Sequence, residues 1–178
     1  MNTLFHICCA PCSISCLESL REEGIRPTGF WFNPNIHPVT EYKSRKLALE
    51  EYAKSTNLPM LWADDYGLRP FLSGLNGKFD DRCGFCYEIR LMETAKKAAE
   101  EGFDSFSTSL LVSPYQNHEL LQKIGEEMAQ KYGVSFLYRD FRPQFREGQN
   151  KARELGLYMQ KYCGCIFSEE ERYLKKKR

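Results

Sequence analysis

The chain has 178 residues, of which 42% are hydrophobic and 28% charged, and its formal net charge at pH 7 is +1. These values suit one globular domain, residues 1–178, and argue against a disordered or fibrous protein. The small net charge means that an anionic partner must be met by local basic patches.

No run of about 18 apolar residues occurs, so we expect no membrane partner. The N-terminus lacks the basic start of a secretory signal. We therefore expect a cytoplasmic protein.

Short apolar runs alternate with amphipathic stretches along the chain. Strands are predicted at residues 3–7, 27–32, 58–62, 103–108 and 134–138. Helices are predicted at residues 11–24, 40–56, 83–101, 116–132 and 144–155, and again after Ser168, where Ser168 and Glu171 fit a capping box. Residues 67–81 hold glycine, proline and polar side chains, which predicts a loop. Strands that alternate with helices indicate an α/β fold, a parallel sheet flanked by helices, with a helical C-terminal part.

The ligand site of such a sheet lies beyond the carboxyl ends of its strands. Cys8 and Cys9 directly follow the first predicted strand, and the turn at Ser113 and Pro114 follows the fourth. We therefore expect the functional site beside the cysteine pair.

Cysteines are frequent and clustered: the eight of them stand at positions 8, 9, 12, 16, 83, 86, 163 and 165. Disulfide frameworks are rare in the cytoplasm, and a single free cysteine is usually a small buried hydrophobe. Grouping into CCxxC, CxxC and CxC argues against that explanation for the set. Cys16 is the exception, because it lies one helical turn after Cys12 beside Leu17 and is predicted to be core.

The first two groups lie at predicted helix starts, where exposed amides lower the pKa of thiols and favour metal binding. Thiolates hold either tetrahedral zinc or an iron–sulfur cluster. Only the CxxC pair resembles a zinc knuckle, and adjacent cysteines project in different directions from extended backbone, which favours a cluster; zinc remains the alternative. The predicted ligands of one [4Fe–4S] cluster are Cys8, Cys9, Cys83 and Cys86.

Cys163 and Cys165 are separated only by Gly164. A disulfide between them would close a small, strained ring, and strained disulfides tend to be catalytic or regulatory. We predict redox work for this pair. Metal binding and simple packing against Phe167 are the alternatives.

Basic and aromatic residues alternate over residues 138–146, and basic residues recur at Lys151, Arg153 and 175–178. RNA is often held by cations that bind phosphate and by rings that stack on unstacked bases, although a solvated charged face is the ordinary alternative. Neither a Walker A loop nor a GxGxxG motif is present, so no motif supports bound ATP or NAD.

Six motifs occur in order over nearly the whole chain: HICCAPC at 6–12, NPNIHP at 33–38, RCGFCY at 82–87, LLVSPYQNH at 110–118, DFR at 140–142 and YCGC at 162–165. Together they resemble the cobalamin-independent epoxyqueuosine reductases of the QueH type. Serines at Ser107 and Ser109, where threonines are expected, are small departures.

The resemblance implies a HUP-like fold, that of the adenine nucleotide alpha-hydrolases, in which cysteines replace the nucleotide loop. It implies the last step of queuosine formation, in which the epoxide of epoxyqueuosine in the tRNA anticodon loop is reduced to the alkene. By this resemblance Cys8, Cys9, Cys83 and Cys86 are the cluster ligands, and Cys163 and Cys165 are the redox-active pair. Cys12 is the spare thiol best placed to hold an additional iron ion.

Several roles stay open at this point. The electron donor is unidentified, and Asp81, Tyr115 and His118 are candidate proton donors. An iron–sulfur tRNA sulfur-transfer enzyme is one rival function, although it would need the missing ATP loop. A zinc-binding RNA-binding module is the other.

Overall fold

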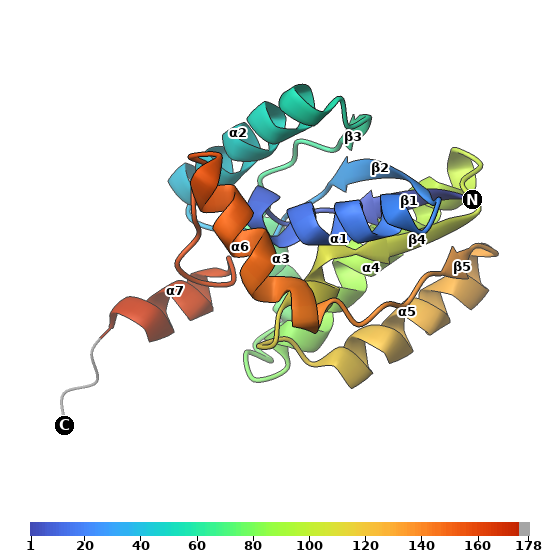
Figure 1. The fold of residues 1–178 in the computed structure, drawn as a ribbon. Helices are drawn as coiled ribbons and strands as arrows, with labels where there is room; N and C mark the ends of the chain where they lie inside the picture. Colours follow the sequence, from blue (N-terminus) through green and yellow to red (C-terminus); the bar gives the residue numbers. More distant parts are fainter. Residues whose placement is uncertain (175–178) are drawn as a thin grey trace.

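Five parallel strands form one sheet in the order β3-β2-β1-β4-β5 in the computed structural model, which describes residues 1–174 (Figure 1). The strands are β1 (Asn2–His6), β2 (Arg26–Trp31), β3 (Met60–Trp62), β4 (Ser105–Thr108) and β5 (Ser135–Phe136). All neighbouring strands pair in parallel, so their carboxyl ends lie at one edge of the sheet. The predicted parallel sheet is confirmed. The basic segment 175–178 lies outside the described residues.

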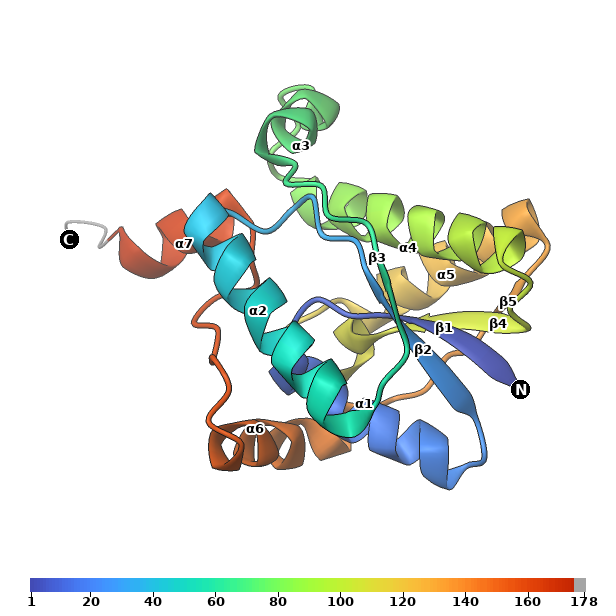
Figure 2. The ribbon, with the colours of Figure 1, turned by 90° about the horizontal axis from the view of Figure 1, so that it is seen from above.

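Helices cover both faces of the sheet (Figure 2). The helices are α1 (Ala10–Glu22), α2 (Val39–Thr56), α3 (Leu68–Leu75), α4 (Arg82–Glu100), α5 (His118–Tyr132), α6 (Phe145–Glu154) and α7 (Ile166–Tyr173). Helices α1, α2 and α6 pack on one face, whereas α4 and α5 pack together on the other. Short 3-10 turns, η1 (Ser109–Val112) and η2 (Arg142–Gln144), complete the chain. Helix α7 lies at the end of the sheet to which the strands point (Figure 1).

The core forms around β1, which is the central strand. Leu4 and Phe5 are fully buried, and because successive strand residues point to opposite faces, they pack into different helical layers. Trp31 on β2 is also fully buried. Burying a large apolar side chain stabilises the fold by about 1.5–3 kcal/mol. The buried residues of the sheet therefore fix the positions of the strand ends from which the loops begin.

The loop predicted at residues 67–81 is wrong in its first half, because α3 forms there. Phe71 and Leu75, one turn apart, are buried and pack against Phe85 of α4. Pro70 falls in the first helical turn, where a missing backbone N–H removes no helical hydrogen bond. Tertiary packing of one apolar stripe therefore overrides the breaker signal of glycine and proline.

The predicted capping box at Ser168 is also wrong. Helix α7 begins at Ile166, and Cys165 is its N-cap, with its sulfur accepting a bond from the Ser168 backbone N–H at 3.4 Å. Glu171 instead forms an ion pair with Arg82 of α4. The helix starts before the predicted position because a thiol replaces the expected hydroxyl cap.

Among residues 1–174, no helix is both long enough and apolar enough to cross a lipid bilayer.

Candidate metal and redox centre

The crevice for a ligand lies between the carboxyl ends of β1 and β4. From β1 the chain builds outward through β2 and β3, and then returns to place β4 on the other side of β1. Ligands bind at such a reversal of strand order in open α/β sheets. Cys8 follows β1 and Ser109 follows β4; the Cys8 N–H donates to Ser109 Oγ at 3.1 Å, and that hydroxyl lies 3.4 Å from Cys8 Sγ.

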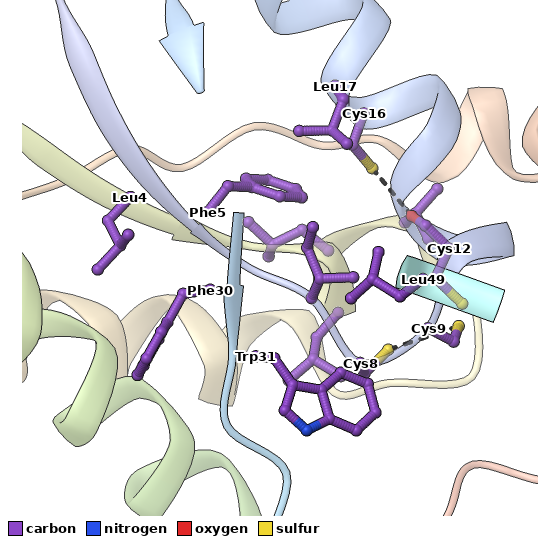
Figure 3. Close-up of a cluster of buried hydrophobic side chains, with 14 of the residues drawn as sticks. Leu4, Phe5, Cys8, Cys9, Cys12, Cys16, Leu17, Phe30, Trp31 and Leu49 are labelled. Carbon is purple, nitrogen blue, oxygen red and sulfur yellow. Dashed lines mark hydrogen bonds between the residues drawn. The ribbon is translucent and has the colours of Figure 1, made fainter. Parts of the chain in front are cut away.

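Three thiols converge at this crevice. The sulfur atoms of Cys8, Cys9 and Cys12 all lie within 4.8 Å of one another, and we call them the three-thiol group (Figure 3). Cys9 is the N-cap of α1 with extended backbone, which turns its side chain toward Cys8 at an Sγ–Sγ distance of 3.8 Å. Cys16 points away and donates to the Cys12 carbonyl at 3.3 Å, fully buried in the core as predicted.

The three thiols of the group differ in their pKa. Hydrogen bonds from the Cys12 and Cys9 thiols hold the pKa of Cys8 well below its usual range. Burial raises the pKa of Cys9, and the bond to Cys8 raises that of Cys12. The three-thiol group therefore contains one buried thiolate, at Cys8, which accepts hydrogen bonds from two thiols. Such a soft, anionic set of sulfur ligands fits a thiophilic metal ion or cluster.

Cys83 and Cys86 lie at the start of α4, as predicted, but outside the three-thiol group. Cys86 is buried beside Cys165 and Phe71, and burial raises its pKa to about 11. Burial also raises the pKa of Cys83. Among residues 1–174, the three-thiol group is the set of potential metal ligands whose sulfur atoms lie within 4.8 Å of one another. It includes Cys12, and it includes neither Cys83 nor Cys86.

Two buried arginines flank the thiols. Arg90 of α4 donates from Nη2 to Cys86 Sγ at 3.0 Å, and its charge also lowers the pKa of Cys8. Arg45 of α2 pairs with Glu41 at 2.7 Å. No sequence pattern singles out either arginine, because each is one polar residue on an amphipathic helix.

Gln160 contacts the three-thiol group from the C-terminal segment. Its Nε2 donates to Cys9 Sγ at 2.9 Å and to Cys12 Sγ at 3.0 Å. Its Oε1 is buried without a hydrogen-bond partner among the described residues. Because buried polar atoms are normally paired, this orphan indicates space for a further ligand beside the thiols.

Residues of α2 and of the loop before it hold the Cys163–Cys165 segment by hydrogen bonds to its backbone carbonyls. Arg45 donates to the carbonyls of Tyr162 and Cys163, at 2.7 and 3.0 Å. The His37 N–H donates to the Gly164 carbonyl at 2.8 Å. Gly164 has φ +138, and a Cβ there would come within 3.1 Å of Ile36, so only glycine fits this turn.

The two thiols of this segment differ in exposure and in protonation. Cys163 is exposed, whereas Cys165 is buried. Their sulfur atoms lie 3.0 and 3.5 Å from the Ser168 hydroxyl. A hydrogen bond from the Cys165 thiol lowers the pKa of Cys163 to about 6, and the same contact raises the pKa of Cys165. The exposed thiol is therefore the ionised one at neutral pH.

One cavity of about 540 Å³ joins the three-thiol group to the redox segment. Cys8, Cys12 and Cys163 all line it, together with Arg45 and Gln160. Its size suits a small-molecule group the size of a nucleobase or larger. Thiols from two distant segments, residues 8–12 and Cys163, therefore face one ligand space.

His6 and His37 are structural. His6 is fully buried, with Nε2 3.1 Å from both the Phe32 carbonyl and Asn33 Oδ1, and burial lowers its pKa to about 4. His37, also buried, bridges the Pro34 carbonyl and the Ile166 N–H.

The candidate proton donors differ in their relation to the cavity. Tyr115 lines it, whereas Asp81 and His118 do not.

A solved structure shares this fold: a predicted subunit of tRNA methyltransferase from Methanocaldococcus jannaschii, with a TM-score of 0.57 and 12% identity, matches 86% of this chain and 75% of its own. The fold and the site together define a HUP-like α/β protein with a cysteine cluster at its ligand crevice. The family model described as "Epoxyqueuosine reductase QueH" matches residues 3–171. The chain belongs to this family, which confirms the resemblance of its motifs.

Curated relatives agree with that family. The epoxyqueuosine reductase QueH of Dehalococcoides mccartyi is 35% identical, over 96% of this chain and 93% of its own. The protein of the same name from Thermotoga maritima is also 35% identical, over 96% of this chain and 92% of its own.

Proposed function

We propose that this protein is an oxidoreductase that reduces the epoxide of epoxyqueuosine in tRNA to the alkene of queuosine. Membership of the QueH family supports the reaction. The observation that carries the proposal is the single cavity shared by Cys8, Cys12 and Cys163, because a bound base would meet both thiol sets there. The cytoplasm is the proposed compartment, since its reducing conditions keep such thiols free.

The Cys163–Cys165 pair can balance the reaction. Converting an epoxide to an alkene breaks two carbon–oxygen bonds, releases the oxygen as water, and consumes two electrons and two protons. Oxidation of the Cys163 thiolate and the Cys165 thiol to one disulfide releases two electrons and one proton, and water supplies the second proton. An external donor must then reduce that disulfide before the next turnover.

The chain's own residues prepare this pair. Cys163 supplies the exposed thiolate, and buried Cys165 retains the proton. Arg45 and His37 hold the intervening backbone, which limits the motion of the two sulfur atoms. Positioned groups lower the entropic cost of reaching the reactive geometry.

The cofactor in this proposal is a [4Fe–4S] cluster with Cys8, Cys9, Cys83 and Cys86 as ligands, and Cys12 for an additional iron ion. Support comes from the shared thiolate of the three-thiol group and from the N–H groups that Gln160 and Arg90 direct at sulfur atoms. Such hydrogen bonds are typical of the surroundings of iron–sulfur clusters. When bound, the cluster would supply electrons singly.

Anaerobic incubation with tRNA that carries epoxyqueuosine and a strong reductant tests the reaction. Nucleoside mass analysis should show loss of one oxygen atom, and tRNA that already carries queuosine is the control. Unchanged epoxyqueuosine would reject the reductase assignment. Iron analysis of the anaerobically purified protein tests the cofactor: about four irons per chain are expected from the cluster and about five with the additional ion at Cys12, whereas stoichiometric zinc without iron would reject the cluster.

A further inference from the structure

Tyr115 is unusually exposed for an aromatic residue beside a cavity. Its exposed fraction is 86%, the highest of any large hydrophobic residue in the described part of the chain. Its ring meets Phe145 of α6 edge-on, with ring centroids 6.2 Å apart. Both rings line the cavity that reaches Cys8 and Cys163. An aromatic surface that water covers in the free protein is available to a planar ligand.

The segment that carries Tyr115 is anchored although its ring is free. The Tyr115 N–H donates to Ser113 Oγ at 3.2 Å. Gln116 accepts a bond from the Tyr87 hydroxyl at 2.5 Å and lines the same cavity, as does Gln149. Amide side chains can donate to and accept from the edge of a base. The cavity therefore combines an aromatic wall with edge-reading groups.

We propose that Tyr115 and Phe145 form the stacking surface for the modified nucleobase once it leaves the anticodon loop, with Gln116 and Gln149 at its edge. This subsite rests on the proposed function. Enzymes that act on a base commonly extrude it into a pocket and stack it on aromatic side chains. The wall would hold the base while its epoxide-bearing ring points toward the thiols.

The test is anaerobic binding of an anticodon stem-loop that carries epoxyqueuosine. Tyr115→Ala should raise Kd roughly 5- to 150-fold, the effect of removing one base–aromatic stack. Tyr115→Phe should retain wild-type binding because the ring remains. Trp62→Ala is the matched control, since Trp62 is also an exposed aromatic but lies on the edge strand β3 outside this cavity.

The outcomes separate the subsite from the reductase activity. Equal affinities of Tyr115→Ala, Trp62→Ala and the wild type would overturn the subsite, even if the wild type reduces the base. If instead the wild type fails to reduce the base while Tyr115→Ala binds the stem-loop more weakly, the proposed reaction fails and the subsite stands.

A second inference rests on the charge of Arg90. Its side chain is 3% exposed, and its guanidinium donates to Cys86 Sγ at 3.0 Å and to the Cys86 carbonyl at 3.1 Å. Within residues 1–174 no carboxylate forms an ion pair with it, whereas the equally buried Arg45 has Glu41. A buried charge without a counter-ion is strongly destabilising.

The groups near Arg90 that can carry a compensating negative charge are mainly cysteine thiolates. The titratable groups that interact with its charge include Cys83, Cys86 and Tyr87 of α4, His6 and Cys8 at the end of β1, and Cys163. We infer that Arg90 is a positioning residue whose fixed charge is the counter-ion of the metal-bound thiolates. Because a cation favours the more negative, reduced state of a cluster, Arg90 would also raise the reduction potential. This inference depends on the proposed cofactor, not on the stacking subsite.

Arg90→Met, Arg90→Lys and the surface control Lys97→Met on the same helix test the inference. In the metal-free protein, Arg90→Met should leave Tm unchanged or raise it, because an unpaired buried charge is removed. In the iron-loaded protein, the Met variant should have a more negative midpoint potential, or retain less iron, than the wild type. Arg90→Lys should lie between them because it keeps the charge without the planar fork.

Two results would overturn the counter-ion role. One is an Arg90→Met variant whose Tm falls in the metal-free form as much as in the iron-loaded form, which indicates an ordinary structural residue. The other is an unchanged midpoint potential with full iron content. If Arg90→Met binds no iron, the midpoint potential of Arg90→Lys is compared with that of Lys97→Met. A more negative potential for Arg90→Lys supports the counter-ion role, and equal potentials overturn it.

Discussion

Cys163 and Cys165 show how strongly local contacts separate two identical side chains. The pKa of Cys163 falls to about 6 because the Cys165 thiol donates to its sulfur, while the pKa of Cys165 rises. An ordinary thiol has a pKa of about 8.5. At neutral pH the pair is therefore one thiolate and one thiol, the form that a dithiol reductant requires.

We predict that alkylation of Cys163 by iodoacetamide has its half-maximal rate near pH 6. Only the thiolate reacts, so the rate should rise with pH through the pKa and be low below it. Cys165→Ala removes the donor and should move the midpoint toward about pH 8.5. Peptide mass analysis separates this site from exposed Cys83, whose raised pKa delays its reaction to higher pH. A wild-type midpoint near that of an ordinary thiol would contradict the pairing.

Cysteine spacing predicts which thiols lie close together, but it does not predict which other side chains contact them. Clustered Cys8, Cys9 and Cys12 stand out in the sequence, and the structure gathers them. No sequence motif marks Arg90 or Gln160. Arg90 contacts Cys86 across one turn of α4, and Gln160 contacts Cys9 only because the chain folds back on itself. The four-ligand set with Cys83 and Cys86 stays a prediction.

Helix α3 shows the same limit at the level of elements. Its sequence contains the breakers Pro70 and Gly74, which favour a loop from local propensity alone. The helix forms because Phe71 and Leu75 reach an apolar pocket beside Cys86. Long amphipathic elements such as α4 and α5 were predictable because their periodicity extends over several turns.

Replacing Phe71 should reveal what α3 contributes. Phe71 is 1% exposed, so Phe71→Ala should destabilise the protein by about 3 kcal/mol, since it leaves a cavity. It should also speed the alkylation of Cys86, which loses its cover. Urea unfolding measures the first effect; Leu72→Ala, on the same helix but 37% exposed, is the control and should cost far less. Equal costs for the two variants would show that α3 does not pack as described.

The whole molecule brings thiols from distant segments to one edge of a sheet. Alternation of strands and helices predicts the parallel α/β class, but it does not predict that β1 is central and that the strand order reverses beside β4. That reversal creates the crevice at Cys8. The segment before α7 then crosses the crevice and delivers Cys163, held in place by Arg45. The site therefore depends on contacts between residues far apart in the chain, which local patterns cannot specify.

A single-turnover experiment tests the central claim most directly. Fully reduced protein, freed of external reductant under anaerobic conditions, is mixed with a stoichiometric amount of tRNA that carries epoxyqueuosine. We predict that queuosine forms and that peptide mapping finds a new disulfide between Cys163 and Cys165 in equal amount. Cys163→Ser should yield neither product. Unchanged epoxyqueuosine, or queuosine formed while both thiols stay reduced, would contradict the account.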